Sequence, residues 1–171
     1  VLLGNSMMFQ RFPTHNGYED PGLSNFYGMV MPLLKKGIPV QTVHMENLGY
    51  PETLAQIKVL IMSYANMKPV NEQVHTALAK WVRNGGILIY LGRDDDPFQF
   101  VTEWWNTGNL HYKTASEDLF SKLGVHYQIG HSDYPVKKGR LIVLRNDPKE
   151  FVLKPNMGDT LLEVVKRGYE N

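Results

Sequence analysis

The chain of 171 residues contains no cysteine. This absence excludes thiol nucleophiles, disulfide frameworks, iron–sulfur clusters and zinc sites built on cysteine, but it leaves the cytoplasm and the periplasm both open. An excess of charge of one sign is also lacking, because 18 Lys and Arg oppose 17 Asp and Glu. We therefore expect neither nucleic acid nor membrane as a partner. Apolar runs also stay well short of the roughly 20 residues that a membrane-spanning helix needs.

The sequence also lacks the short motifs that hold phosphates, metals or activated serines. Neither G-x-G-x-x-G after a strand nor G-x-x-x-x-G-K-[ST] occurs, which argues against dinucleotide and P-loop nucleotide binding. No G-x-S-x-G elbow is present, and the six histidines form no H-x-H or H-E-x-x-H pattern. We therefore predict no cofactor and no metal.

What is present is an alternation of apolar strands and amphipathic helices. Strands are expected at 1–4, 39–44, Val59–Ser63, Ile87–Leu91 and 140–144, and helices at 23–36, 71–84, 114–123 and 159–167. A capping box at Thr114 to Glu117 opens the third of these helices, and Gly124 stops it. The runs at 59–63 and 87–91 lack alternation, as is typical of parallel strands covered on both faces. The pattern predicts an α/β fold: a single domain over 1–171 with a mostly parallel open sheet and helices on both faces. Because the chain opens at Val1 without Met, we expect it to be a piece of a longer protein.

In open α/β sheets, ligands gather at the carboxyl ends of the strands. The most charged of these ends is Arg93, followed by Asp94, Asp95 and Asp96. Three carboxylates can bind a hard cation or sugar hydroxyls, or supply an acid–base group. The alternative is a solvated loop, in which one Asp caps a helix that begins near position 97.

Other candidate binding residues surround these strand ends. Tyr64 and Asn66 follow the strand at Val59–Ser63, and Arg11 lies in the loop after the first strand, where it can clamp an anion or pack against another domain. An aromatic segment contains Trp104, Trp105 and, further on, His111. Aromatic faces stack on sugar rings or line protein interfaces, although a tryptophan packed in its own core is also common.

Three segments carry a resemblance to a known fold. Residues 33–40 contain L-x-x-x-G-I-P-V, residues 57–62 form the next apolar strand, and residues 81–88 contain W-V-x-x-G-G-x-L. Together they resemble the class I glutamine-amidotransferase-like fold, which is flavodoxin-like. More narrowly, they resemble the non-catalytic middle domain that follows the barrel in family-42 β-galactosidases and related glycoside hydrolases. The resemblance implies a three-layer α/β/α sandwich.

The resemblance also identifies a departure from the amidotransferases. Those enzymes carry a nucleophilic Cys directly after the strand that corresponds to Ile87–Leu91, where this chain has Gly92 and Arg93. Amide hydrolysis through a thioester is therefore excluded. In family-42 enzymes the domain assists oligomer assembly, and one edge of it can border the active-site cleft of a neighbour. By position, Trp104, Trp105 and the loop of Asp94 to Asp96 are where such contacts would fall.

Three hypotheses about function remain open. The first is a non-catalytic module of a carbohydrate-active protein that serves assembly, as a homo-oligomer or against a neighbouring domain, with possible sugar contacts. The second is a small sugar-utilisation enzyme similar to ThuA-like proteins, with catalysis by Asp94, Asp95 or Asp96. The third is a ligand-sensing or scaffold domain unrelated to sugar.

Overall fold

The fold is seen in a computed structural model, which describes residues 1–4, 21–97 and 99–170, with side chains from residue 25 onward in the second range. The strands are β1 (Leu2–Leu3), β2 (Val43–His44), β3 (Val59–Ser63), β4 (Ile87–Leu91), β5 (Asp133–Val136) and β6 (Gly139–Leu144). The α-helices are α2 (Pro21–Leu34), α3 (Glu72–Arg83), α4 (Ala115–Leu123), α5 (Glu150–Leu153) and α6 (Met157–Glu170). Short 3-10 helices are η1 (Met45–Asn47), η2 (Pro51–Leu54) and η3 (Trp104–Asn106).

The strands form a mostly parallel arrangement. Strands β3, β4 and β6 are parallel neighbours, and β5 adds an antiparallel edge beside β6. Strands β1 and β2 form a separate parallel pair, and β1 lies against β3. The predicted α/β class and the mostly parallel sheet are therefore confirmed.

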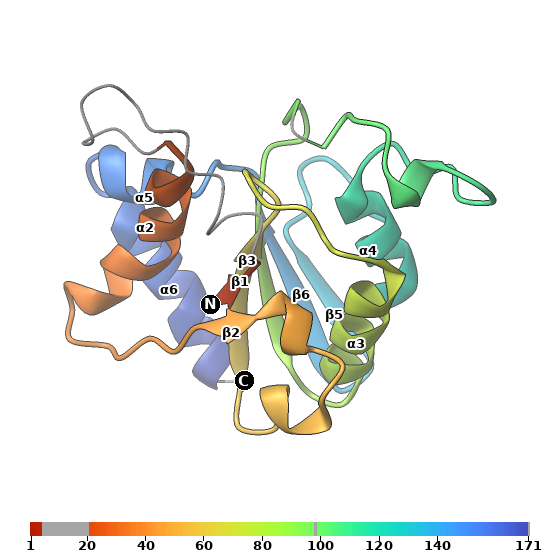
Figure 1. The fold of residues 1–171 in the computed structure, drawn as a ribbon. Coiled ribbons are helices and arrows are strands. Elements are labelled where there is room, and N and C mark those ends of the chain that lie inside the picture. The colour runs from red at the N-terminus through yellow and green to blue at the C-terminus, as the bar shows by residue number, and fades with distance from the viewer. Residues whose placement is uncertain (5–20, 98, 171) are drawn as a thin grey trace.

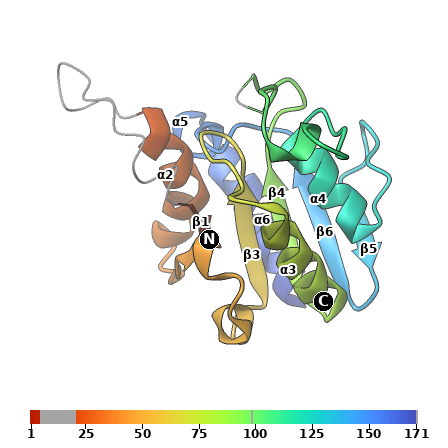
Figure 2. The ribbon, with the colours of Figure 1, turned by 45° about the vertical axis from the view of Figure 1, so that its right-hand side comes forward.

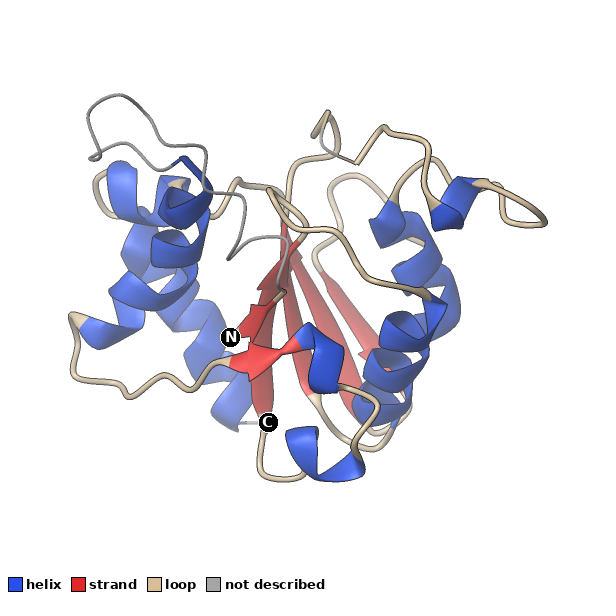
Figure 3. Ribbon diagram, in the orientation of Figure 1, coloured by secondary structure: helices blue, strands red, loops and turns tan. Residues whose placement is uncertain are grey.

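Helices lie on both sides of these strands. Figure 1 shows α3 and α4 on one side and α2, α5 and α6 on the other, and the turned view in Figure 2 keeps this division. Contacts agree, since α3 packs against α4 and β6, whereas α6 packs against α2, α5 and β3. Most residues of β3 and every residue of β4 are buried between them. Figure 3 makes the same division visible by element type.

Local sequence signals explain where α3 begins and ends. The Asn71 side chain accepts a hydrogen bond from the Gln73 backbone N–H at 3.1 Å and so caps the first turn. After the last turn, Gly85 takes a φ of +119°, which favours glycine. At Gly86 an added Cβ would lie 2.4 Å from the ring of Trp81, so glycine leaves the space that this ring fills. The predicted helix and the strand that follows it are confirmed.

The capping box predicted before α4 is also present. The Thr114 hydroxyl accepts from the Glu117 N–H at 3.2 Å, and the Glu117 carboxylate accepts from the N–H of Lys113 at 2.7 Å. Gly124 ends the helix in the left-handed conformation.

Three local expectations need correction. The segment 94–97 forms turns rather than the start of a helix, so no aspartate there caps one. The predicted strand at 39–44 is reduced to Val43–His44. Strand β5, which contains Pro135, is an element that the sequence pattern does not predict. A proline is tolerated there since β5 is an edge strand. Within the described ranges, no helix is both long and apolar enough to cross a membrane.

Candidate functional site

The carboxyl ends of β3, β4 and β6 lie side by side. Their last paired residues, Ser63, Leu91 and Leu144, are in register across the three parallel strands. The described segments that follow, 64–70, 92–97 with 99–103, and 145–149, therefore meet at one edge of the sheet, which we call the carboxyl edge. It is the upper edge in Figure 1. This is the place where open α/β folds bind their ligands.

Asp94 is held by side chains from two other segments of the chain. Its carboxylate accepts a hydrogen bond from the Tyr127 hydroxyl and another from Arg145 Nε at 3.1 Å. The guanidinium of Arg145 also lies 4.4 Å from the centre of the Tyr127 ring and donates to the carbonyls of Gln128 and His131. Burial and the bond to Asp94 raise the pKa of Tyr127. Asp94 thus ties the end of β4 to the start of the loop after β6.

The neighbouring aspartates have other surroundings. Arg93 Nε lies 3.5 Å from Asp95 and 3.3 Å from Asp147, which follows β6. Asp96 is buried, and burial together with Asp96 and Asp94 raises the pKa of the Tyr90 hydroxyl to about 12. Asp94 and Asp95 therefore pair with different arginines, Arg145 and Arg93, whereas Asp96 is buried.

Asn66 adopts a strained backbone at the end of β3. Its φ is +60°, and its side-chain oxygen accepts from the Asn25 amide at 2.6 Å. The oxygen of Asn25 in turn accepts from the Lys149 backbone N–H at 3.1 Å. Buried Asn25 therefore joins α2 to the segments after β3 and β6. Arg11, the other candidate in this area, lies outside the described residues.

Tyr64 belongs to a buried hydrogen-bonded chain. Its hydroxyl lies 2.5 Å from His75 Nε2 on α3, and His75 Nδ1 lies 2.5 Å from Asp118 Oδ2 on α4. All three side chains are fully buried. Because Nδ1 faces a carboxylate, we assign the imidazole proton to Nδ1, so that Nε2 accepts from Tyr64.

The electrostatics of this hydrogen-bonded chain favour a neutral His75. Burial lowers the pKa of His75, although Asp118 opposes this shift, and burial raises the pKa of Tyr64. The other carboxylate oxygen of Asp118 lies 3.8 Å from Lys122 Nζ, which also contacts Glu72 at 2.5 Å. The chain of bonds ties β3, α3 and α4 together and exposes no reactive atom.

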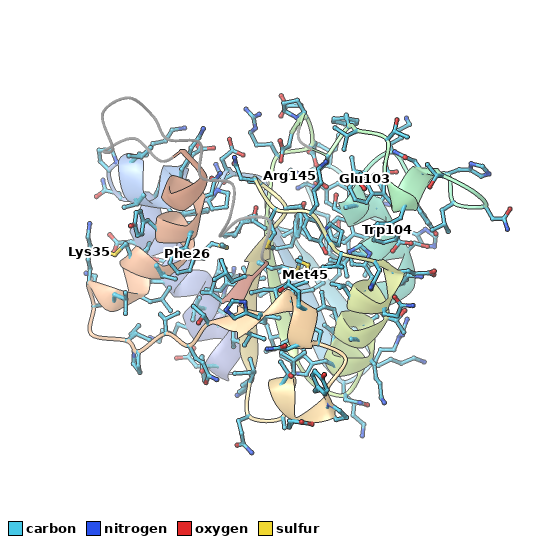
Figure 4. All side chains as sticks on the ribbon, viewed as in Figure 1. Phe26, Lys35, Met45, Glu103, Trp104 and Arg145 are labelled. Carbon is cyan, nitrogen blue, oxygen red and sulfur yellow. The ribbon has the colours of Figure 1, made fainter. Side chains whose placement is uncertain are left out.

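The tryptophan pair packs into the fold. Trp105 is only 1% exposed. Trp104 is half-buried, donates from its indole nitrogen to the Pro69 carbonyl at 2.9 Å and packs 5.3 Å from the His75 ring. Figure 4 shows Trp104 beside α3 and α4, with Glu103 and Arg145 above it. His111 is exposed in the loop that follows. The pair therefore offers little of its ring surface to a ligand.

Sequence reasoning did not single out His75, Asp118, Asn25 or Arg145. A signal existed for the first two: each is a titratable residue at a core-facing position of an amphipathic helix, between buried apolar neighbours. Asn25 and Arg145 carried no comparable signal. Within the described residues, no cluster of three or more His, Asp and Glu side chains is arranged to hold a metal ion.

Comparison with known proteins adds no relative. No protein-family model matches the chain, and neither a curated protein nor a solved structure shows significant similarity to it.

Proposed function

We propose that the chain is a non-catalytic α/β module of a carbohydrate-active protein, of flavodoxin-like three-layer type, that serves assembly with a neighbouring domain or a second copy. The observation that carries this proposal is that charged side chains at the carboxyl edge pair with one another. Asp94 bonds to Arg145 and Tyr127, and Arg93 lies between Asp95 and Asp147. An acid–base pair needs two groups directed at one reacting atom, and these carboxylates are directed elsewhere.

The turn after β4 gives further support. In the amidotransferase-like proteins that this chain resembles, the nucleophile follows this strand. Here the position holds Gly92, where an added Cβ would lie 2.9 Å from the ring of Tyr90. A larger residue at 92 would have to displace a buried tyrosine. The turn is therefore fitted to glycine and not to a catalytic side chain.

The size of the native polypeptide tests whether the chain is a module. An antibody raised against this chain would be used on a lysate of the source cells. We expect a band far above 19.6 kDa, the mass of the chain itself. A band near 19.6 kDa would overturn the proposal, because the chain would then not be a module of a larger polypeptide.

A second experiment tests the absence of catalysis. The isolated chain would be incubated with a panel of aryl glycosides, beside the variants Asp94→Asn, Asp95→Asn and Asp96→Asn. We expect no turnover from any of the four proteins. Turnover by the parent chain that one of these variants abolishes would replace the module with a small enzyme that uses that carboxylate.

A further inference from the structure

A groove of about 750 Å³ opens at the opposite edge of the sheet, where β3 and β4 begin. Its walls are η2, the segment 55–58 that leads into β3, and one face of α3. The volume lies within the roughly 300–1,000 Å³ that is usual for small-molecule sites. We call it the amino-edge groove. The residues that define it are Tyr50, Gln56, Lys58, Gln73, Lys80 and Trp81.

Two aromatic rings line this groove. Trp81 is half-buried and held from two sides, because its indole N–H donates to the Ile57 carbonyl at 3.3 Å and its ring packs on Gly86. Tyr50 is 62% exposed, which is far more than a tyrosine packed in the core. A fixed indole and an accessible phenol offer apolar faces on which the C–H groups of a sugar ring can pack.

The charges in the groove are of one sign. Among the described residues that line it are Lys58 and Lys80 but no Asp or Glu. Lys58 donates to the Tyr169 carbonyl at 2.5 Å, whereas Lys80 is exposed on α3 and makes no ion pair with the described residues. The closest acid along α3, Glu72, already contacts Lys122. Lys80 is therefore the cation of the groove that is open to a ligand.

Neutral hydrogen-bonding groups complete the lining. The amides of Gln56 and Gln73 are exposed there, and Asn84 adds a third amide at the end of α3. A primary amide donates and accepts at once, as a sugar hydroxyl does, so the two pair readily. Aromatic faces, amides and one open cation form a set that suits a sugar with a negative charge.

We propose that the amino-edge groove binds an acidic oligosaccharide, with a sugar ring against Tyr50 and Trp81 and its carboxylate against Lys80. The choice of a saccharide over other anions rests on the proposed function, whereas the aromatic and cationic surface stands without it. This site lies at the edge of the sheet opposite to the loop of Asp94 to Asp96, to which the sequence assigned any sugar contact.

The test is calorimetric titration of the whole chain with tetragalacturonate. Neutral galactotetraose and hexaglutamate serve as the uncharged sugar and the acidic peptide of similar length. We expect tetragalacturonate to bind, to bind more tightly than either comparison molecule, and to weaken as salt is added. Equal binding of galactotetraose would overturn recognition of the charge. Tighter binding of hexaglutamate would overturn the proposal that the ligand is a saccharide. No binding of tetragalacturonate would overturn the proposal that the groove is a binding site.

Variants locate the site on the surface. Tyr50→Ala and Lys80→Gln are each expected to weaken binding of tetragalacturonate about tenfold, which is the scale of one stacking or charge contact. Both residues are exposed, so both variants should fold like the parent chain. The matched controls are Tyr27→Ala and Lys35→Gln, since both residues are exposed and lie away from the groove, Tyr27 on α2 and Lys35 directly after it. Equal weakening by the controls would place the binding elsewhere.

The two proposals can fail separately. If the native band is large but tetragalacturonate does not bind, the module stands and the groove is no saccharide site. If the native band is near 19.6 kDa but the chain binds tetragalacturonate at the groove, the saccharide site stands and the module is rejected.

Discussion

The two edges of the sheet use polar side chains in opposite ways. At the carboxyl edge, charged groups meet one another: Arg93 lies between Asp95 and Asp147, and Arg145 bonds to Asp94. At the amino edge, Lys80 faces an open groove that holds no carboxylate among its described lining residues. The carboxyl edge is far richer in charge, yet its charges hold the loops together. In this protein the charge-rich loop after β4 is therefore held in place by ion pairs, and the less charged edge is the one open to a ligand.

Variants of aromatic residues should show the largest difference in the free energy of unfolding between the two edges. Trp105→Ala removes a side chain that is 1% exposed, and we expect it to lower the free energy of unfolding by about 3–5 kcal/mol. Tyr50→Ala, at the groove, should change it by no more than about 0.5 kcal/mol, as surface substitutions do. Urea denaturation followed by circular dichroism measures both. Similar losses in the two variants would break the comparison.

A smaller effect is expected from the buried hydrogen-bonded chain below the carboxyl edge. Tyr64→Phe removes the donor to His75 Nε2 and leaves that nitrogen buried without a partner, at a cost of about 1–3 kcal/mol. The matched control is Tyr112→Phe, whose hydroxyl bonds to Ser121 at an exposed position. Its loss should be near zero, because water replaces the partner. If both variants lose the same stability in urea denaturation, the buried Tyr64–His75 bond contributes no more to stability than an exposed one.

The elements of this fold could be predicted where the signal is local. Consecutive apolar residues identified β3 and β4, and the Thr114 cap with Gly124 identified α4. Strand β5 was missed because its pairing depends on a turn at Lys137, whose φ of +55° is uncommon for lysine. A local pattern cannot show that such a turn forms, since tertiary pairing stabilises it.

The candidate site was harder to predict for the same reason. The sequence placed Asp94 at the end of a strand correctly, but its partners Tyr127 and Arg145 are 33 and 51 residues away. The contact of His75 with Asp118 spans 43 residues and exists only because α3 packs on α4. Such contacts between distant residues decide whether a charged side chain is ion-paired or accessible to a ligand. Patterns in a single sequence do not contain them.

The pH dependence of stability tests whether His75, in the buried hydrogen-bonded chain, is neutral in the folded protein. Burial lowers the pKa of His75, so the unfolded chain binds a proton at this residue more readily than the folded protein does. Stability from this group is therefore present above its unfolded pKa, about 6.5, and is lost as the pH falls below that value. The charged groups that act on His75 are Asp118, Lys122 and Glu72.

The measurement is the free energy of unfolding of the parent chain and of His75→Gln between about pH 5 and pH 8. The parent should lose stability toward acid more steeply than the variant, which lacks this titration. An equally steep or shallower profile for the parent would show that His75 accepts a proton in the folded protein, with Asp118 as its charged partner.

The smallest effect is expected where the sequence is most charged. Asp94→Asn keeps the shape of the side chain but removes its charge, and its bonds to Arg145 and Tyr127 are partly exposed to water. Because exposed ion pairs contribute little, we expect a loss of about 0.2–1 kcal/mol in urea denaturation. Asp95→Asn is the control, since Asp95 is more exposed and, among the described residues, forms an ion pair only with Arg93, at 3.5 Å. A loss above that range for Asp94 alone would mean that Arg145 depends on this carboxylate to hold the loop at 128–131. The carboxyl edge would then be a single cooperative network, and its charges would be retained for rigidity rather than for a ligand.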